Sequence, residues 1–454
     1  MIIPKSNFKV LCLDTKLQLK FILFTVIFVS SISYYIEIFA IHEIDGTLNN
    51  ISDDNYNNYN KTAAAAASDI IFSNVINITN NTKDSVYAQI VANDNNVYVV
   101  WQESVRENGY GNNYDIYFKK SEDNGNTFGQ AINLSNNIGF SEHPQIAQSK
   151  KGIFIVWADN TNSNNTEIMF AKSLDDGKTF SKPINLSNNL KNSNNQEISV
   201  FNENVYVVWQ DVDDQNNNKQ NSSIMFKSSI DSGNTFNDTI KLATNTNDAY
   251  PKVNSYGDNI YIVWNTEKSN SKSENDKHTE GLFFIKSADN GNNFGNINRI
   301  VLNNFGESQI AVNENKVFIV WGGLHEKNIN DIYLVKSDDN GTSFTDPYTI
   351  QENITDLEVK NQSNKINHPT NVEITNNQPE YIVWQDKVSQ KNQDIFITHV
   401  KNSFQTSQML NLSNNSGISE CPQIAIANNH IYVIWEDITP GNHEILFTYG
   451  TVHK

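Results

Sequence analysis

Cysteine is scarce in this chain of 454 residues, which contains only Cys12 and Cys421. Cys12 precedes an apolar stretch typical of an export signal, so a mature chain would hold Cys421 alone and could form no internal disulfide. Packing must therefore stabilise the fold. The sequence repeats described below can provide it, because each repeat packs on its neighbours.

Basic residues and common catalytic motifs are also few. Lysine and arginine together number 33 against 51 acidic residues, and the formal net charge is −18. That sign disfavours a phosphate backbone or an anionic membrane surface as a partner. The nine histidines show no metal-ligand spacing, and the chain has no Gly-x-Ser-x-Gly elbow, phosphate loop or dinucleotide fingerprint. The sequence therefore predicts neither nucleic-acid binding nor one of these reaction types.

What the chain does contain is a repeat. A run such as VYVVWQ at 97–102 occurs seven times, and each copy ends its apolar stretch on one of the seven tryptophans, Trp101, Trp157, Trp209, Trp264, Trp321, Trp384 and Trp435. Their spacings of 56, 52, 55, 57, 63 and 51 residues are typical of a solenoid, an array or a propeller. Because each run is short, β-branched and aromatic, it predicts a strand buried on both faces.

A second predicted strand follows each apolar run, and in five repeats it leads into a turn of the form Ser-x-Asp-x-Gly-x-Thr-Phe. We expect each aspartate to accept hydrogen bonds from amides one or two residues on, and each glycine to adopt a positive φ. The phenylalanine, such as Phe128, should pack between neighbouring sheets. The turn residues are Asp123 and Gly125, Asp175 and Gly177, Asp231 and Gly233, Asp289 and Gly291, and Asp339 and Gly341.

Two further predicted strands complete each repeat, with the forms INLSNN at 132–137 and HPQIA at 143–147. Four short strands per repeat predict an all-β, seven-bladed β-propeller of four-stranded antiparallel blades. The segment 70–82 looks like an outer strand without its own blade, and the last repeat lacks an outer strand. We therefore expect the N-terminal segment to close the ring, which removes free sheet edges. A six-bladed ring of the sialidase type is the alternative.

The five turns resemble the Asp-box (BNR) repeats of the sialidase-like β-propeller family, and the resemblance covers nearly all of residues 70–454. It implies a propeller whose boxes lie on the face opposite the usual ligand site. Enzymes of this family grip the substrate carboxylate with three arginines, whereas this chain has only Arg106 and Arg299. The arginine triad is therefore missing, and the resemblance supports the fold more than a sialidase activity.

Ahead of the repeats, the chain divides into two segments. Residues 1–40 combine basic residues with an apolar stretch, which predicts a cleaved signal peptide or, alternatively, an uncleaved signal anchor. Residues 41–69 are rich in Asn and Ala and predict a disordered linker to the propeller at 70–454. We expect a secreted or cell-surface protein, membrane-anchored if residues 1–40 stay attached. Sequons such as Asn77-Ile-Thr and Asn133-Leu-Ser are consistent with a glycoprotein.

Acidic residues recur just after the tryptophans, at Glu103, Asp159, Asp211, Glu267, Asp386 and Asp437. Two interpretations stay open. These residues could form a ring of carboxylates at the channel mouth that binds a hard cation such as calcium, or sugar hydroxyls. Alternatively, each acid only caps the turn that leaves its strand. His143, at the start of an innermost strand, is a further candidate ligand contact or a plain surface histidine.

Two functions follow from these expectations. The preferred one is an exported, non-catalytic propeller that binds a glycan or an extracellular protein through its loop face. The alternative is a sialidase-like glycoside hydrolase that uses carboxylates at the channel mouth. No cofactor is expected other than calcium on the acidic ring. We expect a monomer that meets a membrane only through an N-terminal anchor and does not bind nucleic acid.

Overall fold

A computed structural model describes residues 70–105, 113–161, 165–212, 222–244, 246, 249–266, 281–301, 308–324, 330–350, 369–375, 378–389, 391–399 and 409–452. The regular structure in these ranges consists of 29 β-strands in seven antiparallel sheets. Within the same ranges no helix is long and apolar enough to cross a membrane. The predicted signal segment, the linker and Glu267 lie outside the described residues.

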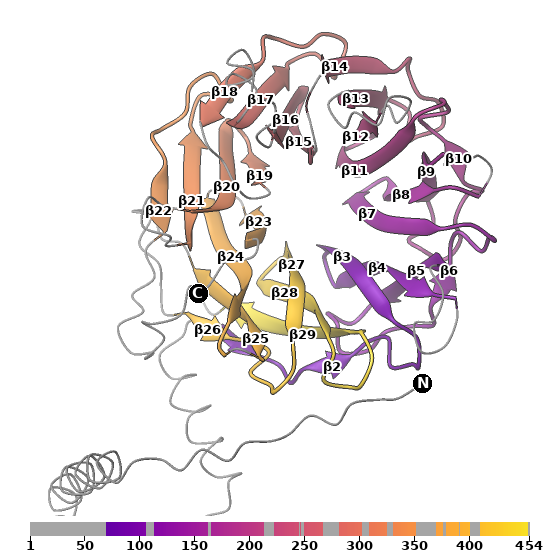
Figure 1. Ribbon diagram of the computed structural model, residues 1–454, viewed down its shortest axis with the longest axis vertical. Coiled ribbons are helices and arrows are strands. Elements are labelled where there is room, and N and C mark those ends of the chain that lie inside the picture. Colours follow the sequence, from indigo (N-terminus) through magenta and orange to yellow (C-terminus); the bar gives the residue numbers. More distant parts are fainter. Residues whose placement is uncertain are drawn as a thin grey trace, which may run out of the picture. The chain divides into compact units, whose positions relative to one another are not determined.

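The seven sheets are the blades of a propeller, and one strand of each lies nearest the common axis (Figure 1). The prediction of seven blades is confirmed, and the six-bladed alternative is wrong. The innermost strands are β3 (Ser85–Asn93), β7 (Ser141–Ser149), β11 (Asn192–Phe201), β15 (Lys252–Tyr256), β19 (Ser308–Asn313), β23 (Pro369–Thr375) and β27 (Ser419–Ala427). They begin blades 1 to 7 in that order.

The second strand of each blade carries the tryptophan and is buried on both faces, as predicted. Val97, Val99 and Val100 of blade 1 are 0% exposed. These strands are β4 (Asn96–Ser104), β8 (Gly152–Asp159), β12 (Asn204–Val212), β16 (Asn259–Thr266), β20 (Lys316–Leu324), β24 (Gln378–Lys387) and β28 (His430–Asp437). The third strands are β5 (Tyr114–Ser121), β9 (Glu167–Ser173), β13 (Ser222–Ser229), β17 (Gly281–Ser287), β21 (Asn330–Ser337), β25 (Gln393–His399) and β29 (Glu444–Val452).

The outer strands are short. In blades 1 to 6 they are β6 (Ile132–Asn133), β10 (Ile184–Asn185), β14 (Ile240–Thr244), β18 (Asn298–Val301), β22 (Tyr348–Ile350) and β26 (Leu410–Asn411). In blade 7 the outer position is taken by β1 (Ile70–Phe72) and β2 (Ile76–Asn77), which both pair antiparallel with β29. Figure 1 shows these first strands beside the last blade. The predicted ring closure by the N-terminal segment is therefore confirmed.

The hydrophobic core lies between blades. One cluster, for example, joins Tyr98, Val100 and Phe118 of blade 1 to Ile155 and Trp157 of blade 2. Six similar clusters occur among the described residues. Because each sheet is apolar on both faces, it can bury its side chains only against a neighbour on either side.

The five Ser-x-Asp-x-Gly turns follow the third strands of blades 1 to 5. In the first of them Asp123 accepts hydrogen bonds from Ser121 Oγ and Thr127 Oγ1, each at 2.7 Å, and from Thr127 N at 2.8 Å. The amide bonded to the carboxylate is thus four residues on, not one or two, because the chain loops around the carboxylate. Gly125 has a φ of 85°, and the other four turn glycines also have positive φ, as predicted.

The phenylalanine of each turn packs on the preceding blade, which confirms its predicted place between sheets. Phe180 of blade 2, for example, meets Phe118 of blade 1 edge to face, with ring centroids 4.9 Å apart. Four further turns repeat this contact, Phe128 on Phe447, Phe236 on Phe170, Phe294 on Phe226 and Phe344 on Phe284. The turn glycine lies against the same ring of the preceding blade, so each turn joins two blades.

The strand register separates two faces. In blade 1 Ser85 pairs with Glu103 and Ser104 with Tyr114, so β3 and β5 begin where β4 ends. We call this the tryptophan face, defined by the ends of the second strands and the starts of the innermost and third strands. At the other end of β4, Val97 pairs with Ser121, where the first Ser-x-Asp-x-Gly turn begins. We call this opposite side, on which the turns lie, the box face.

The contact between turn and preceding blade predicts that Gly177→Ala destabilises the protein. Gly177 has a φ of 79°, and an added Cβ would lie 2.8 Å from Phe118 Cζ. Strain and overlap together should lower the free energy of unfolding by about 2 to 4 kcal/mol, measured by urea denaturation. Gly129→Ala is the control, because its Cβ would meet only Lys120 O at 3.6 Å. Equal stability of the two variants would contradict the proposed contact.

Candidate functional site

The acids that follow the tryptophans belong to a buried hydrogen-bond network on the tryptophan face. Asp159 is 6% exposed, and its Oδ2 accepts from Asn137 Nδ2 at 2.7 Å, Ser141 Oγ at 2.8 Å and Trp157 Nε1 at 3.2 Å. Its Oδ1 accepts from Thr161 N at 2.8 Å. One carboxylate therefore ties together the second strand, the innermost strand and the segment that links blades 1 and 2.

The same arrangement recurs at three of the other predicted positions. Glu103, Asp211 and Asp437 are 6%, 4% and 0% exposed, and each accepts from the indole of the tryptophan two residues before it. Each also accepts from an asparagine of the preceding linking segment. Indole and asparagine donors within the fold thus use the hydrogen-bonding capacity of these carboxylates. This favours the interpretation that the acids fix the turns.

Asp386 in blade 6 differs from these four. It is only partly buried, its one described hydrogen bond is from Lys387 N at 2.7 Å, and burial raises its pKa. The indole nitrogen of Trp384, which would be its partner by analogy, is buried without a hydrogen-bond partner among the described residues. Among the described residues, Asp386 therefore lacks the hydrogen bonds that hold Asp159.

His143 is exposed and lies in a bulge of its innermost strand. Equivalent bulges in blades 1, 3 and 7 place Tyr87, Asn195 and Cys421 in the same conformation, with φ between 51° and 53°. Such left-handed residues are uncommon outside glycine and are often found at functional sites. In these four blades the bulge places one side chain of the innermost strand at the tryptophan face.

The bulges of blades 1, 2 and 7 are each held by the preceding blade through the residue directly after a tryptophan. Gln102 Oε1 accepts from His143 N, and Gln385 Oε1 accepts from Cys421 N, both at 2.6 Å. In blade 7 the acceptor is a carboxylate, because Glu436 Oε1 accepts from Tyr87 N at 2.6 Å. The same backbone contact is thus made by a neutral amide in two blades and by an acid in the seventh.

Glu436 belongs to a cluster with Glu420 and His443. Glu436 is 4% exposed, and Glu420 lies directly opposite it across β27 and β28. One ligand atom of each of the three residues lies within 4.8 Å of the others. Burial raises the pKa of Glu436 to about 8, and the negative charge of Glu420 adds to the rise. We call Glu420, Glu436 and His443 the blade 7 triad.

An aromatic patch lies beside the triad on blades 1 and 2. Tyr87, which is 46% exposed, meets the His143 ring edge to face, with centroids 4.4 Å apart. Burial raises the pKa of both Tyr87 and Tyr114, and the nearby carboxylates of Glu436 and Glu142 raise both further. The patch therefore combines exposed rings with several carboxylates at the seam of blades 7, 1 and 2.

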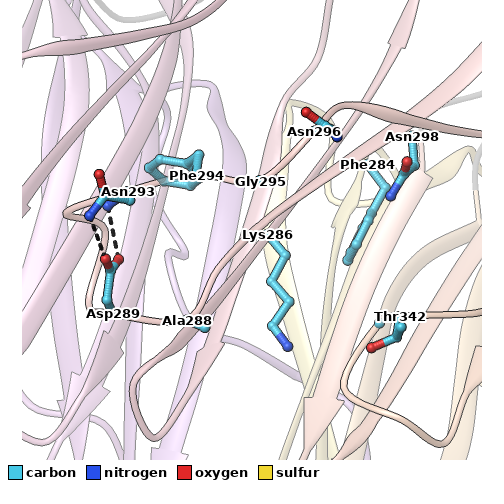
Figure 2. A pocket seen from close by; sticks show the side chains of 11 residues that line it. Phe284, Lys286, Ala288, Asp289, Asn293, Phe294, Gly295, Asn296, Asn298 and Thr342 are labelled. Carbon is cyan, nitrogen blue, oxygen red and sulfur yellow. Dashed lines mark hydrogen bonds between the residues drawn. The ribbon is translucent and has the colours of Figure 1, made fainter.

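A separate pocket of about 520 Å³ lies on the box face between blades 4 and 5 (Figure 2). Lys286 projects between two turns there, and its Nζ donates to Asn340 O at 2.8 Å. The remaining lining comes mainly from the turn residues of both blades, such as Asp289, Asn293 and Thr342. Since these residues belong to the repeated turns, the pocket follows from the architecture of the blades.

The sequence pointed to His143 but not to Tyr87, Glu420 or Glu436. It also did not predict that His443 lies beside the two glutamates. Histidine spacing could not reveal the triad, because its members come from two strands and a loop. The available signal was a departure from the repeat. Glutamine follows the tryptophan at 102, 210 and 385, whereas glutamate follows it at 436.

Comparison with known proteins gives a limited result. No family model matches the chain, and no curated protein matches it. A protein of unknown function from Dyadobacter fermentans is 12% identical with a TM-score of 0.49, over 85% of this chain and 99% of that one. Trypanosoma rangeli sialidase is 11% identical with a TM-score of 0.48, over 81% of this chain and 55% of that one. A Hadza microbial sialidase is 13% identical with a TM-score of 0.45, over 78% of this chain and 76% of that one.

At these identities and TM-scores the likeness transfers no activity, substrate or site to this chain. The chain spans about half the length of the Trypanosoma sialidase, since it matches 55% of it. The fold is established by the strand pairing of the seven sheets themselves. Any function has to be argued from the residues of the tryptophan face.

Two aspartates of the predicted ring should respond differently to the same change. Asp159→Asn replaces a carboxylate that accepts four hydrogen bonds, so the free energy of unfolding should fall by about 2 to 4 kcal/mol. Asp386→Asn should leave stability at pH 7 unchanged or raise it, because it removes a charge that burial disfavours. Urea denaturation of both variants measures the difference. Similar losses of unfolding free energy in the two variants would contradict the stabilising role assigned to the hydrogen bonds of Asp159.

Proposed function

We propose that this protein is an exported β-propeller that binds a glycan through the tryptophan face without turning it over. It would act in the secreted or cell-surface space as a monomer, anchored to the membrane if residues 1–40 are not cleaved. The binding region is the aromatic patch of Tyr87, Tyr114 and His143 with the acids around it. An extracellular protein that presents such a glycan is included in this proposal.

The exposed Tyr87 and His143 pair is the observation that carries the proposal. Its rings meet at 4.4 Å and come from adjacent blades, each on a bulge held by the blade before it. Rigid aromatic side chains offer contact area at low entropic cost, and carboxylates beside them can accept hydrogen bonds from sugar hydroxyls. A site built on strands is also better preorganised than one built on loops.

Charge favours a neutral or amine-bearing sugar over an anionic one. The negative charges of Glu142 and Glu420 both raise the pKa of Tyr87, so the patch lies in a negative field that opposes a sugar carboxylate. Arg299, the single arginine in the described part of the chain, is exposed on the outer strand β18. This supports the expectation that the usual sialidase recognition of a carboxylate does not operate here.

A glycoside hydrolase is the second candidate, and Glu436 is the observation in its favour. With a pKa raised to about 8, this side chain holds a proton at neutral pH as a general acid must, and Glu420 provides a second carboxyl group close by. Hydrolysis of fluorogenic glycosides by the purified protein, lost in Glu436→Gln, would move the protein to this class.

Glycan binding can be tested on an array followed by calorimetry with the purified protein. We expect neutral or amino-sugar glycans to bind and sialylated ones to bind weakly or not at all. Tyr87→Ala should weaken the affinity by about tenfold or more, because it removes an aromatic contact at the centre of the patch. Tyr256→Ala is the control, since this tyrosine is 37% exposed at the opposite end of an innermost strand.

Three results would contradict the proposal. The first is the absence of binding to every neutral and amino-sugar glycan. The second is an equal loss of affinity in Tyr87→Ala and Tyr256→Ala, which would place the site away from the patch. The third is preferential binding of sialylated glycans, which would contradict the argument from charge.

A further inference from the structure

Blade 7 differs from the other blades at the position that follows the tryptophan. Gln102 and Gln385 show that an amide oxygen is sufficient to hold the next bulge, and they do so at the same distance of 2.6 Å as Glu436. The carboxyl group of Glu436 makes this same contact, but an acid at this buried position must either carry a disfavoured charge or hold a proton. The backbone contact therefore does not explain why this residue is an acid.

His443 also departs from the repeat, whereas the position of Glu420 carries an acid in one other blade. His443 precedes the third strand, where blade 1 has Tyr114 and blade 2 has Thr166. Glu420 stands where blade 1 has Val86, blade 2 has Glu142 and blade 3 has Asn194. Of blades 1, 2, 3 and 7, only the last combines two acids and a histidine at these three positions.

The triad lacks a counter-charge among the described residues. Like charges directly opposite each other on adjacent strands destabilise a sheet, and Glu420 and Glu436 become such a pair when both are ionised. No lysine or arginine in the described part of the chain forms an ion pair with either. In addition, His443 Nδ1 is buried and has no hydrogen-bond partner in the part of the chain that the structure describes. A buried carboxylate without a counter-charge is costly unless something else neutralises it.

We propose that Glu420, Glu436 and His443 bind a divalent first-row transition metal, with Zn²⁺ as the best fit. The inference goes beyond the glycan-binding function and does not depend on it. A dication would offset both carboxylate charges and accept the free electron pair of the imidazole. The ligand atoms, which lie within 4.8 Å of one another, are close enough to converge on one ion after small side-chain adjustments.

The donor set selects the class of metal. Two carboxylates and one imidazole are typical of zinc and its neighbours in the first transition row. Calcium is disfavoured here, because it takes six to eight oxygen ligands and does not use imidazole. Three protein ligands also leave a coordination position for water or for an oxygen of a bound molecule.

The surrounding structure holds the ligands in place. Glu436 is oriented by the hydrogen bond from Tyr87 N at 2.6 Å. The backbone of His443 is fixed on both sides by blade 1, because His443 N donates to Asp84 Oδ1 at 3.1 Å and Ser85 N donates to His443 O at 2.8 Å. Such outer contacts preorganise a metal site and typically change its affinity by about 10- to 100-fold when lost.

Metal binding can be measured directly on the purified, tag-free protein after treatment with a chelator. Titration with Zn²⁺ by calorimetry should show one saturable site, and Co²⁺ should give visible absorption bands that Zn²⁺ abolishes. Zn²⁺ should also raise the thermal midpoint, since it binds only the folded state. We expect Glu436→Gln and His443→Tyr each to weaken Zn²⁺ affinity by at least about tenfold.

The variants are chosen to keep the fold. Glutamine already occupies the position of Glu436 in three blades, and tyrosine occupies that of His443 in blade 1. His430→Asn is the matched control, because His430 lies in the same blade and its buried Nδ1 also has no partner among the described residues. It begins β28 at the box face and should leave Zn²⁺ affinity unchanged.

The proposal is overturned if the wild-type protein shows no saturable Zn²⁺ site. It is equally overturned if Glu436→Gln and His443→Tyr, folded by their urea transitions, bind Zn²⁺ as tightly as the wild type. Displacement of Zn²⁺ by an equal concentration of Ca²⁺ would refute the assigned class of metal. None of these outcomes depends on whether a glycan binds.

Discussion

The burial of apolar side chains between neighbouring sheets is the interaction on which the whole fold depends. Each second strand is apolar on both faces, so no blade can bury its own side chains and all seven must stack in a ring. The turn phenylalanines extend the same contact to the periphery, where Phe180 meets Phe118 of the blade before it. The box aspartates fold the turns that position these rings.

Much of the fold could be predicted because the same signals recur along the chain. The apolar runs predict the tryptophan strands, and the turn glycines predict positive φ values. The segment 70–82 has no blade of its own ahead of it, which predicts its pairing with the last blade, and β1 does pair with β29. The hydrogen-bond partners within the turns were harder to predict from the sequence. Asp123 reaches the amide of Thr127, because the turn wraps around the carboxylate and brings a later amide to it.

The candidate site could be predicted only in part, since it depends on contacts between blades. The sequence cannot tell that Asp159 accepts from Asn137 and Ser141, which lie in a preceding segment and the adjacent strand. A regular row of acids therefore resembles a binding ring when read along the chain. The functional signal lies in the exceptions to the repeat, such as Glu436, where chemistry departs from what the scaffold requires.

The pairing of β1 with β29 has a consequence for how the protein is made. Ile70 lies opposite Val452, so the strand synthesised first among those described must await the strand synthesised last. Blades 1 to 6 can stack in order as the chain emerges, whereas the outer edge of blade 7 is uncovered until β1 docks. A chain caught before that step would offer an open sheet edge to another copy. Docking of β1 is thus the step that completes the outer edge of blade 7.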